Sequence, residues 1–251
     1  MARNKRRWLW ACCAAALALP VASGAAFRIK VMDSSRAHVP SNVAWTSETI
    51  REANGGDALR GLLISRRCER CHGQEGFSPS PSIPNLASMN SLVIWKQLED
   101  FRTGKRVSEV MERIAGALSP QDSADLGAYY SLLPNSPDPM DSRSFPEPIS
   151  NAALLGVAAR LISLGDGHRG IPPCQACHGP VAYVLGAPSL TTQNSDYILR
   201  ELEQFSEGSR ANDINLRMRS IASQLTDDEK QALAEYYGAG RGNLPAAAIS
   251  K

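Results

Sequence analysis

Apolar residues recur at helical spacing along this 251-residue chain. Residues three and four positions apart share one face of a helix, so each such stretch predicts a helix with an apolar face. The recurring positions are Leu59, Leu62 and Leu63; Ile94, Leu98 and Phe101; Leu126, Tyr129, Tyr130 and Leu133; Leu154, Val157, Ala158, Leu161 and Ile162; Ile198, Leu202 and Phe205; Leu233, Tyr236 and Tyr237. No stretch of useful length alternates with the two-residue period of a strand. The pattern therefore predicts an all-α protein.

The second half of the chain repeats the pattern of the first half. Ile94, Leu98 and Phe101 match residues of the same type 104 positions later, and Leu126 and Tyr130 match residues 107 positions later. Each half also contains a hydroxyl residue followed three positions later by an acid, which indicates a helix start. These starts are Ser119-Pro120-Gln121-Asp122 and Thr226-Asp227-Asp228-Glu229. The repeat predicts two tandem domains.

Composition marks the boundaries of these domains. The stretch 134–150 holds five prolines with several Ser and Asp residues, which is typical of an extended linker. The predicted segments are 1–25, a signal peptide or uncleaved anchor; 26–49, an irregular N-terminal segment; 50–134, the first domain; 135–150, the proline-rich linker; 151–241, the second domain; and 242–251, a C-terminal tail.

The N-terminus is typical of an export signal. Four basic residues precede an uncharged run, Trp8–Phe27, and small residues before Ala25 offer a cleavage site after it. The run is 20 residues long, enough to span a bilayer, so an uncleaved membrane anchor is the alternative. Cleavage would leave 23 Lys and Arg against 25 Asp and Glu. With this mixed charge and no basic stripe, we expect no nucleic-acid partner.

Each half contains one Cys-x-x-Cys-His motif. The residues are Cys68, Cys71 and His72 in the first half and Cys174, Cys177 and His178 in the second. This spacing is the attachment signature of c-type haem. Two thiols three positions apart lie on one side of a helical turn and can add to both vinyl groups of one porphyrin, while the next residue directs its imidazole to the iron. The motifs predict two covalently bound haem c groups.

A sixth iron ligand is expected on the other side of each haem. Met111 follows His72 by 39 residues, and Met218 follows His178 by 40 residues. Their matched positions favour axial ligation by sulfur, which raises the reduction potential of a haem. The alternative is that both are core methionines that fill gaps. The other histidines, His38 and His168, have no counterpart in the opposite half, so we expect them to be exposed to solvent.

A ligating imidazole also needs an acceptor for its second nitrogen, which fixes the tautomer and the ring orientation. Pro84 and Pro188 lie at matching places after the two motifs, so their carbonyls are candidates. The alternative is that both are simply turn prolines.

Across residues 50–240 the chain resembles a two-haem class I c-type cytochrome of the cytochrome c4 family. The residues that carry the resemblance are the two Cys-x-x-Cys-His-Gly motifs, Pro84-x-Leu86, Pro188-x-Leu190, Gln97-Leu98-x-x-Phe101-Arg102-x-Gly104-x-Arg106 and Leu202-x-x-Phe205-x-x-Gly208-x-Arg210-x-Asn212-Asp213. The resemblance implies two tandem class I cytochrome c domains, each with a His/Met-ligated haem. By match, attachment falls to the four motif cysteines, and iron ligation to His72, Met111, His178 and Met218.

The resemblance further implies a periplasmic electron carrier without catalytic residues, either soluble or tethered to the membrane. Its donor would be a cytochrome bc complex or a dehydrogenase, and its acceptor a haem–copper terminal oxidase. Two alternatives stay open: a dihaem relay subunit of a dehydrogenase complex, and a haem enzyme with one open iron position.

Overall fold

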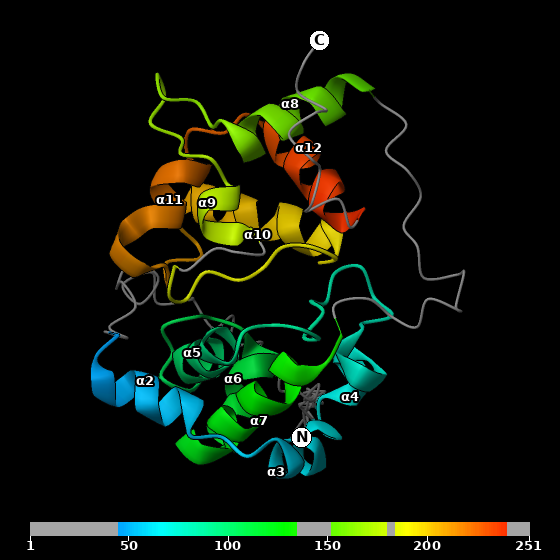
Figure 1. The fold of residues 1–251 in the computed structure, drawn as a ribbon, viewed down its shortest axis with the longest axis vertical. Coiled ribbons are helices and arrows are strands. Elements are labelled where there is room, and N and C mark those ends of the chain that lie inside the picture. The colour runs from blue at the N-terminus through cyan, green and yellow to red at the C-terminus, as the bar shows by residue number, and fades with distance from the viewer. Residues whose placement is uncertain (1–44, 135–151, 180–183, 240–251) are drawn as a thin grey trace, which may run out of the picture. The chain divides into compact units, whose positions relative to one another are not determined.

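The computed structural model describes residues 45–134, 152–179 and 184–239, and within these ranges the regular structure is helical (Figure 1). The first half contains α2 (Ser47–Asn54), α3 (Ala58–Ser65), α4 (Glu69–His72), the 3₁₀ turn η1 (Gln74–Gly76), α5 (Ser91–Arg102), α6 (Glu109–Gly116) and α7 (Pro120–Leu132). The second half contains α8 (Ala152–Ser163), α9 (Gln175–His178), α10 (Ser195–Glu207), η3 (Ile214–Leu216), α11 (Arg217–Ala222) and α12 (Asp227–Gly238). One isolated bridge pairs Asp166 with Ile171. The predicted all-α class is confirmed.

The two halves pack their helices in the same way. In the first half α7 packs against α3 and α5, and α6 packs against α5. In the second half α12 packs against α8 and α10, and α11 packs against α10. The predicted apolar positions Leu126 and Tyr130, and their matches Leu233 and Tyr237, lie buried in the two cores. The repeat in the sequence is therefore a repeat in the structure.

Two predicted helix starts have the expected capping boxes. The Ser119 side chain accepts from the Asp122 main chain at the start of α7, and Thr226 does the same with Glu229 at the start of α12. In both boxes the carboxylate of the acid accepts from the main-chain N–H of the cap residue. The box thus satisfies two main-chain N–H groups that a helix start otherwise leaves without acceptors.

Of the irregular N-terminal segment predicted for residues 26–49, residues 26–44 lie outside the described residues, and its last three residues are helical. Helix α2 begins at Ser47 because Thr46 and Thr49 form a capping box there. Threonine at the N3 position is a less usual partner than Glu or Gln, so the pattern was not visible in the sequence. Helix α2 packs against α5 and α7.

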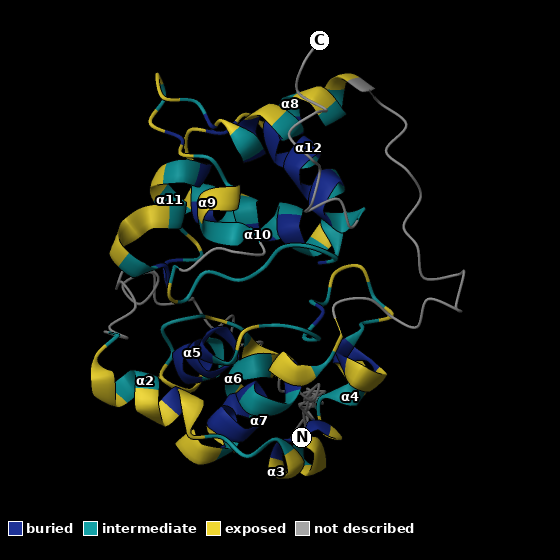
Figure 2. Ribbon diagram, viewed as in Figure 1, coloured by how far each residue is buried: buried dark blue, intermediate teal, exposed yellow. Residues whose placement is uncertain are grey.

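Helix α3 places its predicted apolar face in solvent. Leu59 and Leu63 are 76% and 66% exposed, and Figure 2 shows much of α3 coloured as exposed. The buried face carries Gly61 and Ser65 instead. A Cβ at Gly61 would lie 2.1 Å from the carbonyl oxygen of Asp125 on α7, so the two backbones approach more closely than a leucine face would permit.

Three predicted segments lie outside the described residues: the signal or anchor 1–25, the linker 135–150 and the tail 242–251. Among the residues that are described, no helix has the length and apolar character needed to cross a bilayer. Both halves fall within one compact unit, Asp33–Lys251.

Candidate haem-binding sites

Each Cys-x-x-Cys-His motif forms a single helical turn. In the first motif the main-chain N–H groups of Cys71 and His72 both donate to the carbonyl of Cys68, at 3.1 and 2.9 Å. The second motif repeats this pattern from Cys174, at 3.2 and 2.9 Å. Residues three positions apart lie on the same face of a helical turn, so each turn places the two cysteines of its motif on one face. Burial raises the pKa of the Cys174 thiol to about 11. This is the local geometry that attachment of one porphyrin by two thioethers requires.

Both motif histidines bond to the expected proline carbonyls. His72 Nδ1 lies 2.8 Å from the oxygen of Pro84, and His178 Nδ1 lies 2.8 Å from the oxygen of Pro188. A carbonyl can only accept, so Nδ1 carries the proton and Nε2 keeps its lone pair for a metal. Burial lowers the pKa of both imidazoles, although the two carbonyls oppose the shift. Both rings are therefore in the neutral form that binds iron.

The two methionines of the predicted ligand set lie at matching places in the fold. Met111 is in the first turn of α6 and Met218 is in the first turn of α11, and both are partly buried. Ser108 caps α6 and accepts from the main-chain N–H of Met111. In the second half the residue before α11, Leu216, has a φ of +58°, which is unusual for a branched side chain. Iron ligation by either sulfur stays a prediction.

Of the two remaining histidines, the structure describes one, His168. His168 is exposed on the loop between α8 and α9, as expected, and its main-chain N–H donates to Asp166. His38 lies outside the described residues.

Two buried polar atoms of the second half have no hydrogen-bond partner among the described residues. The hydroxyl of Tyr237, which is buried near Cys174, has no hydrogen-bond partner among the described residues. Arg219 directly follows Met218 and donates through Nε to Asp213 at 2.6 Å, while its buried Nη2 has no partner among them either. Buried donors without acceptors are uncommon, and the propionates of a haem would offer the Arg219 guanidinium the acceptor it lacks, so the chemistry of the site agrees with this cofactor.

A buried polar cluster between the two halves was not foreseen. Arg210 Nη1 donates to Glu201 at 2.7 Å, and Arg106 Nη2 of the first half lies 3.0 Å from the same carboxylate. Both arginines also donate to Gln97, at 2.8 and 3.2 Å. The equivalent positions of Arg106 and Arg210 were the available signal, since two buried cations at matched places need acceptors.

A second part of this cluster surrounds Asn212 of the second half. Lys96 pairs with Asp100 on α5 and donates to the Asn212 carbonyl at 2.8 Å. The Asn212 amide donates to Asp100 at 2.8 Å. Lys96 and Asp100 are almost fully buried. The interface between the halves is thus held by charge-assisted hydrogen bonds.

No family model matches the chain. It is 38% identical to the thiosulfate dehydrogenase electron acceptor of Stutzerimonas stutzeri, over 68% of this chain and 77% of that protein. Among solved structures, the reduced recombinant cytochrome c4 from Pseudomonas stutzeri superposes with a TM-score of 0.63 at 30% identity, over 73% of this chain and 98% of that one. Thiosulfate dehydrogenase (TsdBA) from Marichromatium purpuratum gives a TM-score of 0.60 at 28% identity, over 72% of this chain and 39% of that one.

The curated cytochromes c4 match over most of their length. That of Pseudomonas aeruginosa is 32% identical over 72% of this chain and 87% of its own. That of Thiocapsa roseopersicina is 36% identical over 67% of this chain and 84% of its own. With its two haem-attachment turns and its repeated helical packing, this chain belongs to the cytochrome c4 family of dihaem c-type cytochromes.

Proposed function

We propose that this chain carries electrons in the periplasm from a thiosulfate dehydrogenase towards a haem–copper terminal oxidase. The observation that supports this donor is the 38% identity to a protein named as the electron acceptor of thiosulfate dehydrogenase. A second protein of that name, from Thiomonas intermedia, is 35% identical over 77% of its length. A cytochrome bc complex is the alternative donor that the family resemblance implies.

As a member of this family, the chain is a dihaem electron carrier rather than an enzyme. When bound, haem c supplies an iron that alternates between the ferric and ferrous states. His72 and His178 would each bind one iron, with their rings fixed by the proline carbonyls. Met111 and Met218 would provide the second ligand to each iron, which would leave no open position for a substrate, and their sulfurs would favour the ferrous state.

Reduction by the proposed donor is tested by stopped-flow absorption. The oxidised protein is mixed with thiosulfate dehydrogenase in the presence and absence of thiosulfate. We expect the ferrous bands of both haems to grow only when thiosulfate is present. If a cytochrome bc complex reduces the protein and thiosulfate dehydrogenase does not, the proposed donor is wrong.

The alternative of a haem enzyme is tested by carbon monoxide, which binds only a ferrous haem with an open or easily vacated position. We expect no spectral change when the gas is added to the reduced protein. The intact mass of the exported protein should show two haem groups, and it also reports whether residues 1–25 have been removed. Uptake of carbon monoxide would favour the enzyme.

A relay subunit within a dehydrogenase complex is the second candidate. It is favoured by the similarity to the solved thiosulfate dehydrogenase (TsdBA), of which this chain covers 39%. Co-purification distinguishes the two: a subunit stays with a dehydrogenase through size-exclusion chromatography, and a free carrier elutes alone.

A further inference from the structure

The loop Ser80–Asn85 belongs to the first half, yet the second half holds its main chain. The carbonyl oxygens and their donors are Ser80 with Asn194 Nδ2 at 3.1 Å, Pro81 with the Tyr197 main chain at 3.1 Å, Ser82 with Arg200 Nη1 at 2.8 Å, Ile83 with Asn194 Nδ2 at 2.6 Å, and Asn85 with Gln193 Nε2 at 2.9 Å. The one other carbonyl of this loop, that of Pro84, accepts from His72. The acceptor of the first haem ligand is thus the centre of a segment fixed from the other half.

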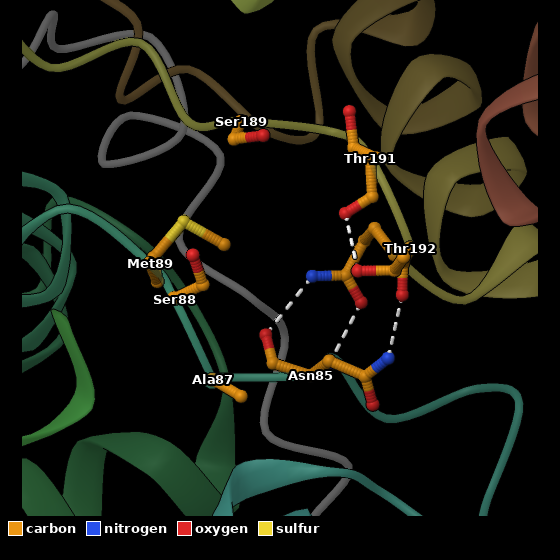
Figure 3. Close-up of a pocket in the computed structure, with 8 residues that line it drawn as sticks. Asn85, Ala87, Ser88, Met89, Ser189, Thr191 and Thr192 are labelled. Carbon is orange, nitrogen blue, oxygen red and sulfur yellow. Dashed lines mark hydrogen bonds between the residues drawn. The ribbon is translucent and has the colours of Figure 1, made fainter. Parts of the chain in front are cut away.

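The residue after Pro84 is held most completely. Gln193 accepts from the Asn85 main-chain N–H at 2.8 Å and donates to its carbonyl, while the Asn85 side chain donates to the Thr192 carbonyl at 2.7 Å (Figure 3). Gln193 and Asn85 are 4% and 9% exposed. Loss of a partner would leave buried polar atoms without bonds, so these contacts resist opening.

Asn194 bonds to the loop of the first half instead of capping its own helix. In the first half its counterpart, Asn90, caps α5 by accepting from the main-chain N–H of Leu92 at 2.9 Å. Asn194 stands at the same place before α10 but makes no side-chain capping bond. Its amide instead donates to Ser80 and Ile83. An asparagine cap stabilises a helix, and here that bond is given up while the same amide makes two hydrogen bonds to the loop.

The arrangement is not reciprocal. Pro188 is the matching proline in the second half, and it is flanked by Ala187 and Ser189. Among the described residues no hydrogen bond from the first half reaches either of them. The support therefore runs in one direction, from the second half to the first haem.

We propose that Gln193 and Asn194 are positioning residues for the first haem. They hold the Pro84 peptide where its carbonyl accepts the Nδ1–H of His72. This hydrogen bond makes the imidazole a more basic ligand and so stabilises ferric iron. The reduction potential of the first haem then depends on the attachment of the second half, whereas that of the second haem does not depend on the first half in this way. The inference rests on the proposed iron-ligating role of His72.

The test uses the full-length haem-loaded protein and the variant Asn194→Ser, which keeps a hydroxyl to cap α10 but cannot span the distance to the loop. Potentiometric titration, with each haem followed by its own NMR methyl signals, gives the two potentials. At a fixed applied potential, we expect the ratio of ferric to ferrous iron in the first haem to fall by about threefold, which means that its reduction potential rises. The ratio in the second haem should stay unchanged. Exchange of the His72 Nδ1 proton with solvent should become at least about tenfold faster, while that of His178 should not change.

Asn90→Ser is the matched control, since Asn90 caps α5 and makes no bond to the loop. It should leave both potentials and both exchange rates as they are. Gln193→Met, which gives the second half the residue that Met89 provides in the first, should act on the first haem in the same direction as Asn194→Ser. Either variant alone suffices for the test if the other does not fold.

Equal shifts of both haems, or unchanged potential and proton exchange in a folded Asn194→Ser variant, would overturn the proposal. Failure of the proposed ligand role looks different. The wild-type protein itself would then lack the low-spin spectrum of a His/Met haem at the first site.

Discussion

Gln97 and Glu201 occupy equivalent positions in the two halves, and both side chains contact the guanidinium groups of Arg106 and Arg210. Each half thus contributes one arginine and one acceptor at matching positions, but only the acceptor of the second half, Glu201, is charged. Two buried cations therefore share a single carboxylate in this part of the interface. Each arginine also lies over a phenylalanine ring of its own half, at 4.7 Å for Arg106 and 4.4 Å for Arg210.

The first prediction concerns that carboxylate. Glu201→Gln keeps the shape of the side chain but removes the carboxylate that two adjacent buried guanidinium groups share. Removing one partner of a buried ion pair costs about 3–5 kcal/mol of unfolding free energy. Denaturation of the haem-loaded protein by guanidinium chloride measures the loss. Glu203→Gln on the same helix is the control, and a similar loss there would contradict the role given to Glu201.

The second prediction concerns acid. Burial alone would raise the pKa of Glu201, but Arg210 and Arg106 outweigh burial and lower it below that of a free glutamate. Because the folded-state pKa lies below the unfolded one, the carboxylate stabilises the fold fully above about pH 4.5, and this stability is lost as the pH falls through the folded-state pKa. The free energy of unfolding, measured from pH 6 down to about pH 3, should decline less steeply in Glu201→Gln than in the wild type. Parallel curves would show that other groups set the acid limit.

The third prediction concerns the iron ligands. Met111→Ala and Met218→Ala should each remove about half of the weak ferric absorption near 700 nm that marks a Met–iron bond, and each should lower one of the two potentials. Met89 is a suitable control because it packs in the core of the first half without a sulfur counterpart in the second. Met89→Ala should leave the absorption intact. An unchanged spectrum in Met111→Ala or Met218→Ala would assign the ligand to another group.

The fourth prediction concerns the crossing of α3 and α7. An alanine at Gly61 would place its Cβ 2.1 Å from the Asp125 carbonyl oxygen, so the helices must separate. Gly61→Ala should cost about 1–3 kcal/mol of unfolding free energy. At Gly156 of α8 nothing lies within 4 Å of the added Cβ, and Gly156→Ala should stabilise the protein by about 0.5–1 kcal/mol through helix propensity. Thermal unfolding of both variants measures the change in unfolding free energy. Equal changes in the two variants would contradict the close approach of α3 and α7 at Gly61.

Local patterns allowed the helices, the caps and the haem-attachment turns to be predicted from the sequence. A capping box such as Ser119 with Asp122, or a Cys-x-x-Cys-His turn, is complete within five residues, and the repeat located its partner in the other half. The carbonyl acceptors of His72 and His178 were also foreseen, because a matched proline followed each motif at a similar distance.

Features that depend on distant pairs could not be predicted in this way. The leucines of α3 indicated the apolar face, but which face is buried was decided by Gly61, whose missing side chain admits the backbone of α7. Gln193 and Asn194 gave no signal, because their partners lie more than 100 residues earlier and are main-chain carbonyls, which every sequence contains. A lysine and an acid four residues apart, such as Lys96 and Asp100, are typical of an exposed helix face, whereas the structure buries this pair against the second half.

The proline and the methionine proposed for each haem site differ in how they would tolerate substitution. The acceptor behind each histidine is a peptide carbonyl at Pro84 or Pro188, and a substitution there changes the side chain while the oxygen remains. The proposed ligand on the opposite side is one thioether, Met111 or Met218, which a single nucleotide change can delete. If these sulfurs bind the irons as proposed, one substitution in either half is enough to leave an iron with a vacant coordination position.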